Sequence, residues 1–230
     1  GNLATARKYL AGRGPQSAGL CMGGYVAAVS NVTEEYDGTS WSSGGNLGTA
    51  RSGLTGAGTQ SAGLCMGGDD GSDSDVTEEY DGTSWAAGGN LGTARTQVAA
   101  AGTQSAGLCM GGNDGSDSNV TEEYDGTSWS GGGNLATARE APAGAGTQSA
   151  GLCAGGDDDG GKLNVTEEYD GSSWSSGGNL ATARKGLAGA GTQTAGLSMG
   201  GTSNPNTNVT EEYDAGTGSY DELFTASQGL

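Results

Sequence analysis

The chain lacks histidine and isoleucine, and its 230 residues include one phenylalanine, three prolines and nine lysines and arginines. Without histidine it has no imidazole to serve as a general base, a proton shuttle or a metal ligand. Its 27 acidic residues give a net charge of −18, which repels phosphate backbones and anionic lipid. We therefore expect no nucleic-acid partner. No apolar run approaches the roughly 18 residues of a transmembrane helix, so we also expect no membrane insertion.

Large apolar side chains are scarce. Leucine, valine and phenylalanine together make up 25 of the 230 residues, whereas glycine alone makes up 49. A highly charged chain with less than about 20% of large aliphatic and phenylalanine residues is usually disordered. Composition alone thus predicts an unfolded acidic polymer, unless the apolar residues recur at a fixed period.

The sequence is an internal repeat. The motif Asn-Leu-x-Thr-Ala-Arg recurs every 44 or 45 residues, and Val-Thr-Glu-Glu-Tyr-Asp keeps the same phase. A fixed period of this length is typical of solenoids and propellers. We expect one domain over residues 1–230, with five repeats at 2–45, 46–89, 90–133, 134–178 and 179–230.

Each repeat has the pattern of four short strands. In the second repeat, residues 61–68 alternate between apolar and small residues, and residues 51–58 and 76–81 provide two more extended runs. Asp81-Gly82 predicts a tight turn before a last strand at Ser84-Trp85. The glycine density disfavours helices. The sequence therefore predicts an all-β fold with four antiparallel strands per repeat.

The order of motifs in each repeat resembles that of the kelch-repeat β-propeller family. The resemblance is carried by Gly67-Gly68, Tyr80-Asp81 and Trp85 of the second repeat and by Arg95, which follows them. It implies a five-bladed kelch-like β-propeller with a 44–45-residue repeat, but no particular activity, because this family includes enzymes, adaptors and structural proteins. The last repeat lacks the tryptophan, and we expect Tyr220 or Phe224 to replace it.

We expect structural ion pairs between the arginine of each Thr-Ala-Arg motif and one glutamate of each Glu-Glu pair. Glu78 shares its strand parity with Val76 and Tyr80. Such pairs would fix the register of the blades, and the alternative is a set of solvated carboxylates. The arginines are Arg7, Arg51, Arg95, Arg139 and Arg184, and the glutamates are Glu34, Glu78, Glu122, Glu167 and Glu211.

The four cysteines occupy one position of the repeat, at Cys21, Cys65, Cys109 and Cys153. Equivalent positions in different blades lie too far apart for a disulfide, so we expect free, buried thiols and synthesis in a reducing cytoplasm.

The loops between the second and third strands vary in sequence while the scaffold stays nearly constant. Such variation is what a recognition surface would show, and unconstrained drift would look the same. Three loops are acidic and carry the candidate binding residues Asp69, Asp70, Asp73, Asn113, Asp114, Asp117, Asp157, Asp158 and Asp159. Their oxygens could bind calcium, but no loop matches an EF-hand. We favour solvating turns and expect no metal and no cofactor.

The loop of the first repeat is apolar where the others are polar. Its candidate binding residues are Tyr25, Val26 and Val29. Exposed apolar loops often mark a contact with another chain, although this loop could instead fold back on its own blade.

Catalysis is difficult to assemble from these residues. The two carboxylates of each Glu-Glu pair point to opposite faces of a strand and cannot flank one bond. We therefore expect a non-catalytic binding or structural module. Glycine-rich, nearly identical repeats resemble those of phage and environmental bacterial proteins, which implies a virion or cell-surface component with protein partners. A carbohydrate-binding propeller is the alternative, and a glycan-processing enzyme is a distant one.

Overall fold

The computed structural model describes residues 1–203 and 206–223. In these residues the chain forms 22 β-strands and no helix. Five sheets have four strands each, and β15 (Asp157–Asp158) forms a separate hairpin with β16 (Gly161–Lys162). The predicted all-β class and the five blades of four antiparallel strands are confirmed. Within the described residues no helix is long and apolar enough to cross a membrane.

Each blade is an antiparallel meander of four strands in chain order. The strands of blades 1 and 2 are β1 (Ala11–Arg13), β2 (Gly19–Met22), β3 (Thr33–Tyr36), β4 (Trp41–Ser43), β5 (Thr55–Thr59), β6 (Ala62–Met66), β7 (Thr77–Tyr80) and β8 (Trp85–Ala87). Those of blade 3 are β9 (Ala99–Thr103), β10 (Ala106–Met110), β11 (Thr121–Tyr124) and β12 (Trp129–Gly131). Those of blades 4 and 5 are β13 (Ala143–Thr147), β14 (Ala150–Ala154), β17 (Thr166–Tyr169), β18 (Trp174–Ser176), β19 (Ala188–Gly191), β20 (Ala195–Met199), β21 (Thr210–Asp214) and β22 (Ser219–Leu223).

The predicted tight turn joins β7 to β8. Asp81 Oδ1 accepts hydrogen bonds from the hydroxyl of Thr83 and from the backbone N–H groups of Thr83 and Ser84. These bonds lower the pKa of Asp81 to about 2. Gly82 adopts φ +91°, a conformation that favours glycine. The Asp-Gly pair therefore fixes the turn between the two outer strands.

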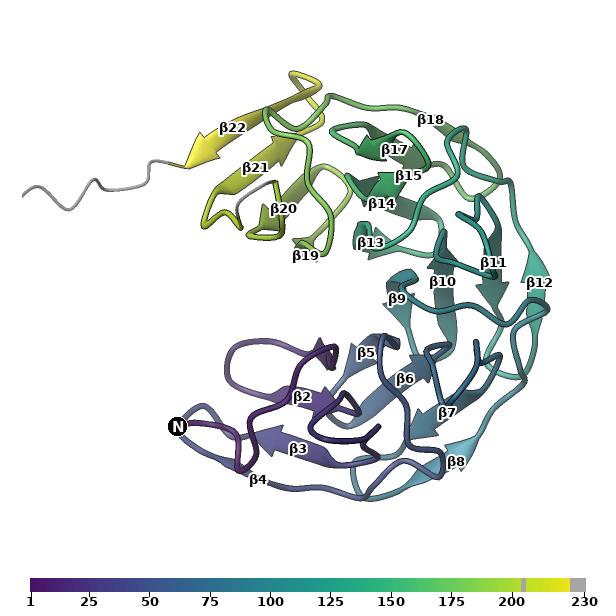
Figure 1. Cartoon of the computed structure of the whole chain (residues 1–230), viewed down its shortest axis with the longest axis vertical. Coiled ribbons are helices and arrows are strands. Elements are labelled where there is room, and N and C mark those ends of the chain that lie inside the picture. Colours follow the sequence, from purple (N-terminus) through teal and green to yellow (C-terminus); the bar gives the residue numbers. More distant parts are fainter. Residues whose placement is uncertain (204–205, 224–230) are drawn as a thin grey trace, which may run out of the picture.

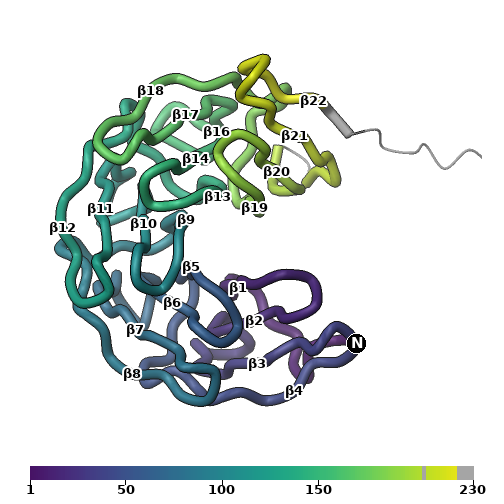
Figure 2. Tube along the Cα trace, turned by 180° about the vertical axis from the view of Figure 1, so that it is seen from behind, coloured from purple at the N-terminus to yellow at the C-terminus, as the bar shows by residue number. Residues whose placement is uncertain are grey.

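The blades form an arc around a central axis. The innermost strands of successive blades pack side by side, β1 on β5, β5 on β9, β9 on β13 and β13 on β19. Figure 1 and the opposite view in Figure 2 show that the arc is open between blade 1 and blade 5.

Small residues let the blades approach closely. A Cβ atom on Gly63 of β6 would come within 2.8 Å of Leu20 Cδ2 in blade 1. The same fit recurs along the arc, between Gly107 and Leu64, Gly151 and Leu108, and Gly196 and Leu152. The glycine content that suggested disorder therefore allows neighbouring sheets to pack face to face.

The interfaces between blades 1 and 2, 2 and 3, and 3 and 4 bury the same kinds of apolar side chain. Between blades 2 and 3, Leu64 and Met66 of β6 pack with Cys109 and Tyr124 of blade 3, and Trp129 lies against them. Each large side chain that is fully buried contributes about 1.5–3 kcal/mol. In blade 5 Tyr220 stands opposite Tyr213, the place that tryptophan has in the other blades, whereas Phe224 lies outside the described residues.

In blades 2, 3 and 4, three side chains donate hydrogen bonds to the preceding blade, and blade 5 has two of the three. In blade 3 they are Tyr124, Trp129 and Gln104, which we call the interface Tyr, Trp and Gln. Tyr124 Oη donates to Glu79 Oε1 (2.6 Å) and Trp129 Nε1 donates to Thr77 Oγ1 (2.9 Å). Gln104 Nε2 donates to the backbone carbonyls of Gly63 and Tyr80. The counterparts are Tyr80, Trp85 and Gln60 in blade 2, Tyr169, Trp174 and Gln148 in blade 4, and Tyr213 and Gln193 in blade 5.

The arginine of each Thr-Ala-Arg motif, which we call the clamp Arg, binds its own blade, and from the second repeat onward it also joins that blade to the preceding one. The backbone carbonyl of Arg51 accepts the N–H of Gly24 in blade 1, while its guanidinium reaches the carbonyls of Gly67 and Val76 in blade 2. It also pairs with Glu78 at 2.9 Å, and both side chains are buried. The other pairs, at 2.5–2.8 Å, are Arg7–Glu34, Arg95–Glu122, Arg139–Glu167 and Arg184–Glu211.

In the first four repeats the two glutamates of the Glu-Glu pair have different roles. Glu78 is buried with the clamp Arg of its own repeat, whereas Glu79 accepts the interface Tyr of the next blade. Neither is a freely solvated carboxylate, because both are bonded within the scaffold. The four cysteines are free and buried, and burial raises the pKa of Cys65 and Cys109 to about 11.

Candidate functional site

The variable residues of all five repeats lie on one face of the arc. Residue 69, which begins the loop between β6 and β7, forms a backbone bridge with Ser52, the residue after the clamp Arg. The equivalent bridges are Lys8–Tyr25, Thr96–Asn113, Glu140–Asp157 and Lys185–Thr202. We call this side of the molecule the variable face. In blades 1 to 4 the Asp-Gly turns between the third and fourth strands lie at the opposite end of the sheet.

The two residues after each clamp Arg were missed by the sequence analysis. They differ in every repeat: Lys8-Tyr9, Ser52-Gly53, Thr96-Gln97, Glu140-Ala141 and Lys185-Gly186. Their variation beside an invariant Thr-Ala-Arg was the signal that could have identified them. The structure places them next to the predicted loops, so each blade contributes two variable segments to the same face.

The second residue of each such pair forms a backbone chain that runs from blade to blade. The N–H of Gly53 donates to the carbonyl of Tyr9, and the N–H of Gln97 donates to the carbonyl of Gly53. Ala141 and Gly186 continue the chain. Tyr9, Gln97 and Ala141 have φ of 50–55°, which is unusual for residues other than glycine and is often found at functional sites. The inner rim of the variable face is thus held in one conformation while its side chains differ.

The acidic loop of blade 2 approaches the loop of blade 3. Asp70 is exposed, and Asp69 Oδ1 accepts the N–H of Gly71 in a local turn. Partial burial raises the pKa of Asp73, and the charges of Asp69 and Asp114 raise it further. The carboxylates of the two loops therefore influence one another.

A second acidic group lies between the loops of blades 3 and 4. Partial burial raises the pKa of Asp117, and the charges of Glu140, Asp159, Asp157 and Asp158 add to this effect. Together these two groups form an acidic strip over blades 2–4. The strip consists of Asp69, Asp73, Asp114, Asp117, Glu140, Asp157, Asp158 and Asp159.

One lysine pairs with the end of this strip. Lys185 Nζ lies 2.5 Å from Asp157 Oδ2 and 3.2 Å from Glu140 Oε1. The hydrogen bond to Asp157 and that to Glu140 raise the pKa of Lys185. Asn113 donates to Glu140 Oε2 at 3.0 Å, so this candidate residue also joins the network between blades 3 and 4.

The loops do not converge on a metal site in the described part of the chain, where no three histidine, cysteine or acidic side chains are placed to hold an ion. The oxygens at the loop tips accept local backbone N–H groups instead. Asn113 Oδ1 accepts from Gly115 and Asp158 Oδ1 accepts from Gly160. The fifth loop begins at Thr202, and its residues 204–205 lie outside the described residues.

The first blade gives the variable face a different character. Lys8 Nζ lies 5.1 Å from the ring centroid of Tyr9 and 5.3 Å from that of Tyr25. Tyr9 is 66% exposed and Val26 is 51% exposed, whereas Val29 is half-buried and bridges back to Tyr25. This blade therefore presents aromatic and apolar surface beside one cation.

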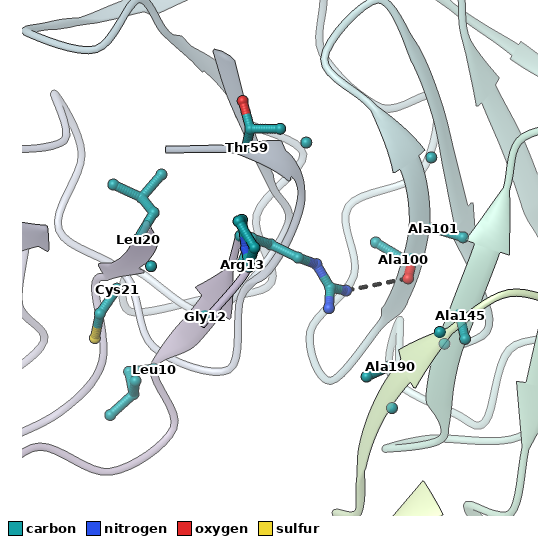
Figure 3. A pocket seen from close by; sticks show the side chains of 18 of the residues that line it. Leu10, Gly12, Arg13, Leu20, Cys21, Thr59, Ala100, Ala101, Ala145 and Ala190 are labelled. Carbon is teal, nitrogen blue, oxygen red and sulfur yellow. Dashed lines mark hydrogen bonds between the residues drawn. The ribbon is translucent and has the colours of Figure 1, made fainter. Parts of the chain in front are cut away.

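The central axis of the arc holds a cavity of about 590 Å³. Its wall of glycine and alanine is interrupted by Arg13, which stands where the other inner strands have alanine. Arg13 donates from Nε to the carbonyl of Gly56 and from Nη2 to that of Ala100 at 3.1 Å (Figure 3). Burial lowers the pKa of Arg13 to about 10. This side chain ties blade 1 to blades 2 and 3 across the axis.

No protein-family model and no curated protein sequence matches the chain. Solved structures do match it. The structure of YjhT, a propeller, superposes with a TM-score of 0.80 over 96% of this chain and 85% of that chain, at 11% sequence identity. The chain has a β-propeller fold. At this identity the likeness shows the fold alone, and it does not show membership of the kelch family.

Proposed function

We propose that this kelch-like propeller is a non-catalytic binding module of a virion or cell surface and that it contacts a protein partner through its variable face. The observation that carries the proposal is the location of the variation. The loops and the residues after each clamp Arg change from repeat to repeat, and backbone bridges join them on one side of the arc. The scaffold beneath them is nearly constant, so the side chains of this face can vary without loss of the fold.

The charge of the variable face indicates the chemistry of the partner. The acidic strip contains eight carboxylates from three neighbouring blades, and Lys185 pairs with two of them at its blade 4 end. Such a surface attracts a partner with lysine and arginine side chains, and the attraction weakens as salt screens it. The virion or cell-surface setting is supported by the resemblance of the repeats to phage and environmental bacterial proteins.

Calorimetric titration with a short oligolysine peptide tests this proposal. We expect salt-dependent binding to the unmodified chain. Binding should be lost in a variant carrying Asp69→Asn, Asp114→Asn, Asp117→Asn and Asp158→Asn, because asparagine retains an oxygen acceptor for the turns but removes the charge.

The matched control carries four substitutions of the same kind on the opposite face: Asp37→Asn, Asp81→Asn, Asp125→Asn and Asp170→Asn. It should bind the peptide as the unmodified chain does. Equal loss of binding in both variants would show that net charge, and not the acidic strip, attracts the peptide, and the proposal would be wrong.

A carbohydrate ligand is the second candidate, and it depends on blade 1. Trp85, Trp129 and Trp174 pack against tyrosines and donate to threonines inside the interfaces, so they are not free to stack on sugar rings. Tyr9 and Tyr25 beside Lys8 remain available on the variable face. Binding on a glycan array that Tyr9→Ala removes would support this candidate, and an array without hits would contradict it.

A further inference from the structure

The two ends of the arc carry opposite halves of the same interface. At the junctions between blades 1 and 2, 2 and 3, and 3 and 4, the earlier blade provides acceptors, namely a glutamate, a threonine and two backbone carbonyls. The later blade provides the interface Tyr, Trp and Gln as donors. At the junction between blades 4 and 5, Tyr213 and Gln193 donate in the same way, and Tyr220 takes the place of the tryptophan. We call these two sides of a blade its acceptor face and its donor face. Blade 5 ends the arc with an acceptor face, and blade 1 begins it with a donor face.

The acceptor face of blade 5 is unoccupied among the described residues. Glu212 and Thr210, the counterparts of Glu79 and Thr77, receive no hydrogen bond from a described side chain. Glu212 is exposed and Thr210 is half-buried, whereas Thr77 is fully buried.

The apolar part of the same face is also uncovered. Leu197 and Met199 of β20 are half-buried, whereas their counterparts Leu64 and Met66 of β6 are fully buried. On β19, Ala188 and Ala190 are exposed, although the equivalent alanines of blades 3 and 4 are buried. Blade 5 therefore exposes the surface that each earlier blade buries.

The donor face of blade 1 lacks a partner in the same way. Within the described chain, Tyr36 Oη, Trp41 Nε1 and Gln16 Nε2 donate to no acceptor. Tyr36 is only half-buried, whereas Tyr80, Tyr124 and Tyr169 are fully buried. The half-buried side chains of Leu3 and Leu10 and the ring of Trp41 line the central cavity instead of a neighbouring blade.

We propose that the opening between blades 1 and 5 binds one further blade built from the same repeat. The occupant must present tyrosine, tryptophan and glutamine toward blade 5 and glutamate and threonine toward blade 1. A blade of this repeat has both sets, on its two opposite faces. A whole second copy fits less well, because the arc curves back toward its start and the four blades beyond the docked one would meet blade 1 (Figures 1 and 2).

The test adds one repeat to the chain. Residues 90–132 are fused directly before Gly1, so that Gly1 takes the position of Gly133 and the repeat stays in phase. Closure of the arc should raise the thermal midpoint by at least about 5 °C relative to the unmodified chain. An unchanged or lower midpoint in a folded chain would contradict the proposal.

Glu212→Lys separates closure from simple lengthening of the arc. In the six-repeat chain it should lower the midpoint, because the added tyrosine loses its acceptor on blade 5. In the unmodified chain it should have no effect, since Glu212 is exposed and receives no hydrogen bond from a described residue. The same effect in both chains, or no effect in either, would overturn the proposal.

If the chain with the added N-terminal repeat does not fold, a fusion at the other end provides a second test. Residues 89–132 are placed directly after Leu223, which corresponds to Gly88, so that the repeat stays in phase, and Tyr36→Phe then reports closure at blade 1. This substitution should lower the midpoint of the lengthened chain only, and equal effects with and without the added repeat would count against closure. The competing occupant is a second copy of the chain, and sedimentation of the unmodified chain tests for it. If the chain associates as its concentration rises, and if Glu212→Lys abolishes this association, the opening binds a second copy and the proposal is wrong.

Discussion

At the scale of single residues, the clamp arginines show how one repeated motif holds neighbouring blades together. Each guanidinium is completely buried and pairs with a glutamate of its own repeat, and in Arg51, Arg95, Arg139 and Arg184 the backbone carbonyl is also bonded to the preceding blade. A buried pair adds little net stability, because its attraction is offset by the loss of hydration. The pair instead fixes the position of the blade, because each clamp Arg fits only where a loop carbonyl and a glutamate accept its hydrogen bonds.

Removing one member of a clamp pair should be strongly destabilising. Arg95→Met leaves Glu122 charged and buried without its partner, so we expect the free energy of unfolding to fall by about 3–5 kcal/mol. Chemical denaturation measures this loss. Lys162→Met, at a lysine that forms no ion pair within the described residues, is the control and should have little effect.

The double variant Arg95→Met with Glu122→Met should recover part of the lost stability, because no buried charge remains. Equal stability of the Arg95→Met variant and the unmodified chain would show that the pair is solvated, and the structural role of the clamp would be wrong.

Strand alternation was enough to place Glu78 with Val76 and Tyr80 on one side of its strand. It could not show that Arg51 reaches Glu78 from 27 positions away while its backbone belongs to the preceding blade, because alternation carries no information on how blades join. The same limit applied to Glu79, whose partner is a tyrosine of the next repeat.

At the scale of strands and loops, the repeat predicted the number and order of the elements but not every boundary. Residues 51–54 precede β5 as a segment between blades, although the sequence suggested one extended run from 51 to 58. Their backbone is bonded to the neighbouring blade and to the variable loop, which local pattern does not reveal. The variable loops were found because their composition differs between repeats.

The acidic strip should respond to pH. Because the folded-state pKa of Asp117 is raised, its neutral form favours folding below its ordinary pKa, and this contribution is lost as pH rises through the raised value. Asp117→Asn should therefore raise the thermal midpoint at pH 7 and leave it nearly unchanged at a pH below that window, as thermal denaturation can measure.

Asp125→Asn is the contrasting control, because backbone hydrogen bonds from Ser128 and Thr127 lower the pKa of Asp125. Its charged form favours folding above the ordinary pKa, so this substitution should lower the midpoint at pH 7. If Asp117→Asn and Asp125→Asn shifted the thermal midpoint at pH 7 in the same direction, the raised pKa of Asp117 in the acidic strip would be wrong.

At the scale of the whole molecule, stacking resolves the conflict between composition and fold. No single blade has enough large apolar side chains for a core of its own, but leucine, methionine, cysteine and tyrosine side chains are buried where blades 1 to 4 meet one another. The periodicity predicted this arrangement. The opening of the arc could not be predicted, since the curvature per blade depends on how the faces meet.

The interface tyrosines make this stacking sensitive to alkali. Burial and the hydrogen bond to Glu79 raise the pKa of Tyr124 to about 12, and Tyr80, Tyr169 and Tyr213 are shifted in the same way. Their contribution to stability is complete below the ordinary pKa of about 10 and is lost as pH rises through about 12. Alkaline titration followed by tyrosinate absorbance and circular dichroism should show these tyrosines ionising together with unfolding.

Ionisation of all the tyrosines near pH 10 in a chain that stays folded would contradict the interface hydrogen bonds. Tyr124→Phe should remove one of the late-titrating groups and leave the others.

The most direct measurement of the central claim is a nuclear magnetic resonance titration of the chain with oligolysine, read at each backbone amide. The account predicts shifts confined to residues 69–74, 113–118, 140–141 and 157–163 on the variable face, with the Asp-Gly turns at the opposite end of each blade unchanged. Shifts of the same size at those turns, or shifts spread evenly over the arc, would contradict it.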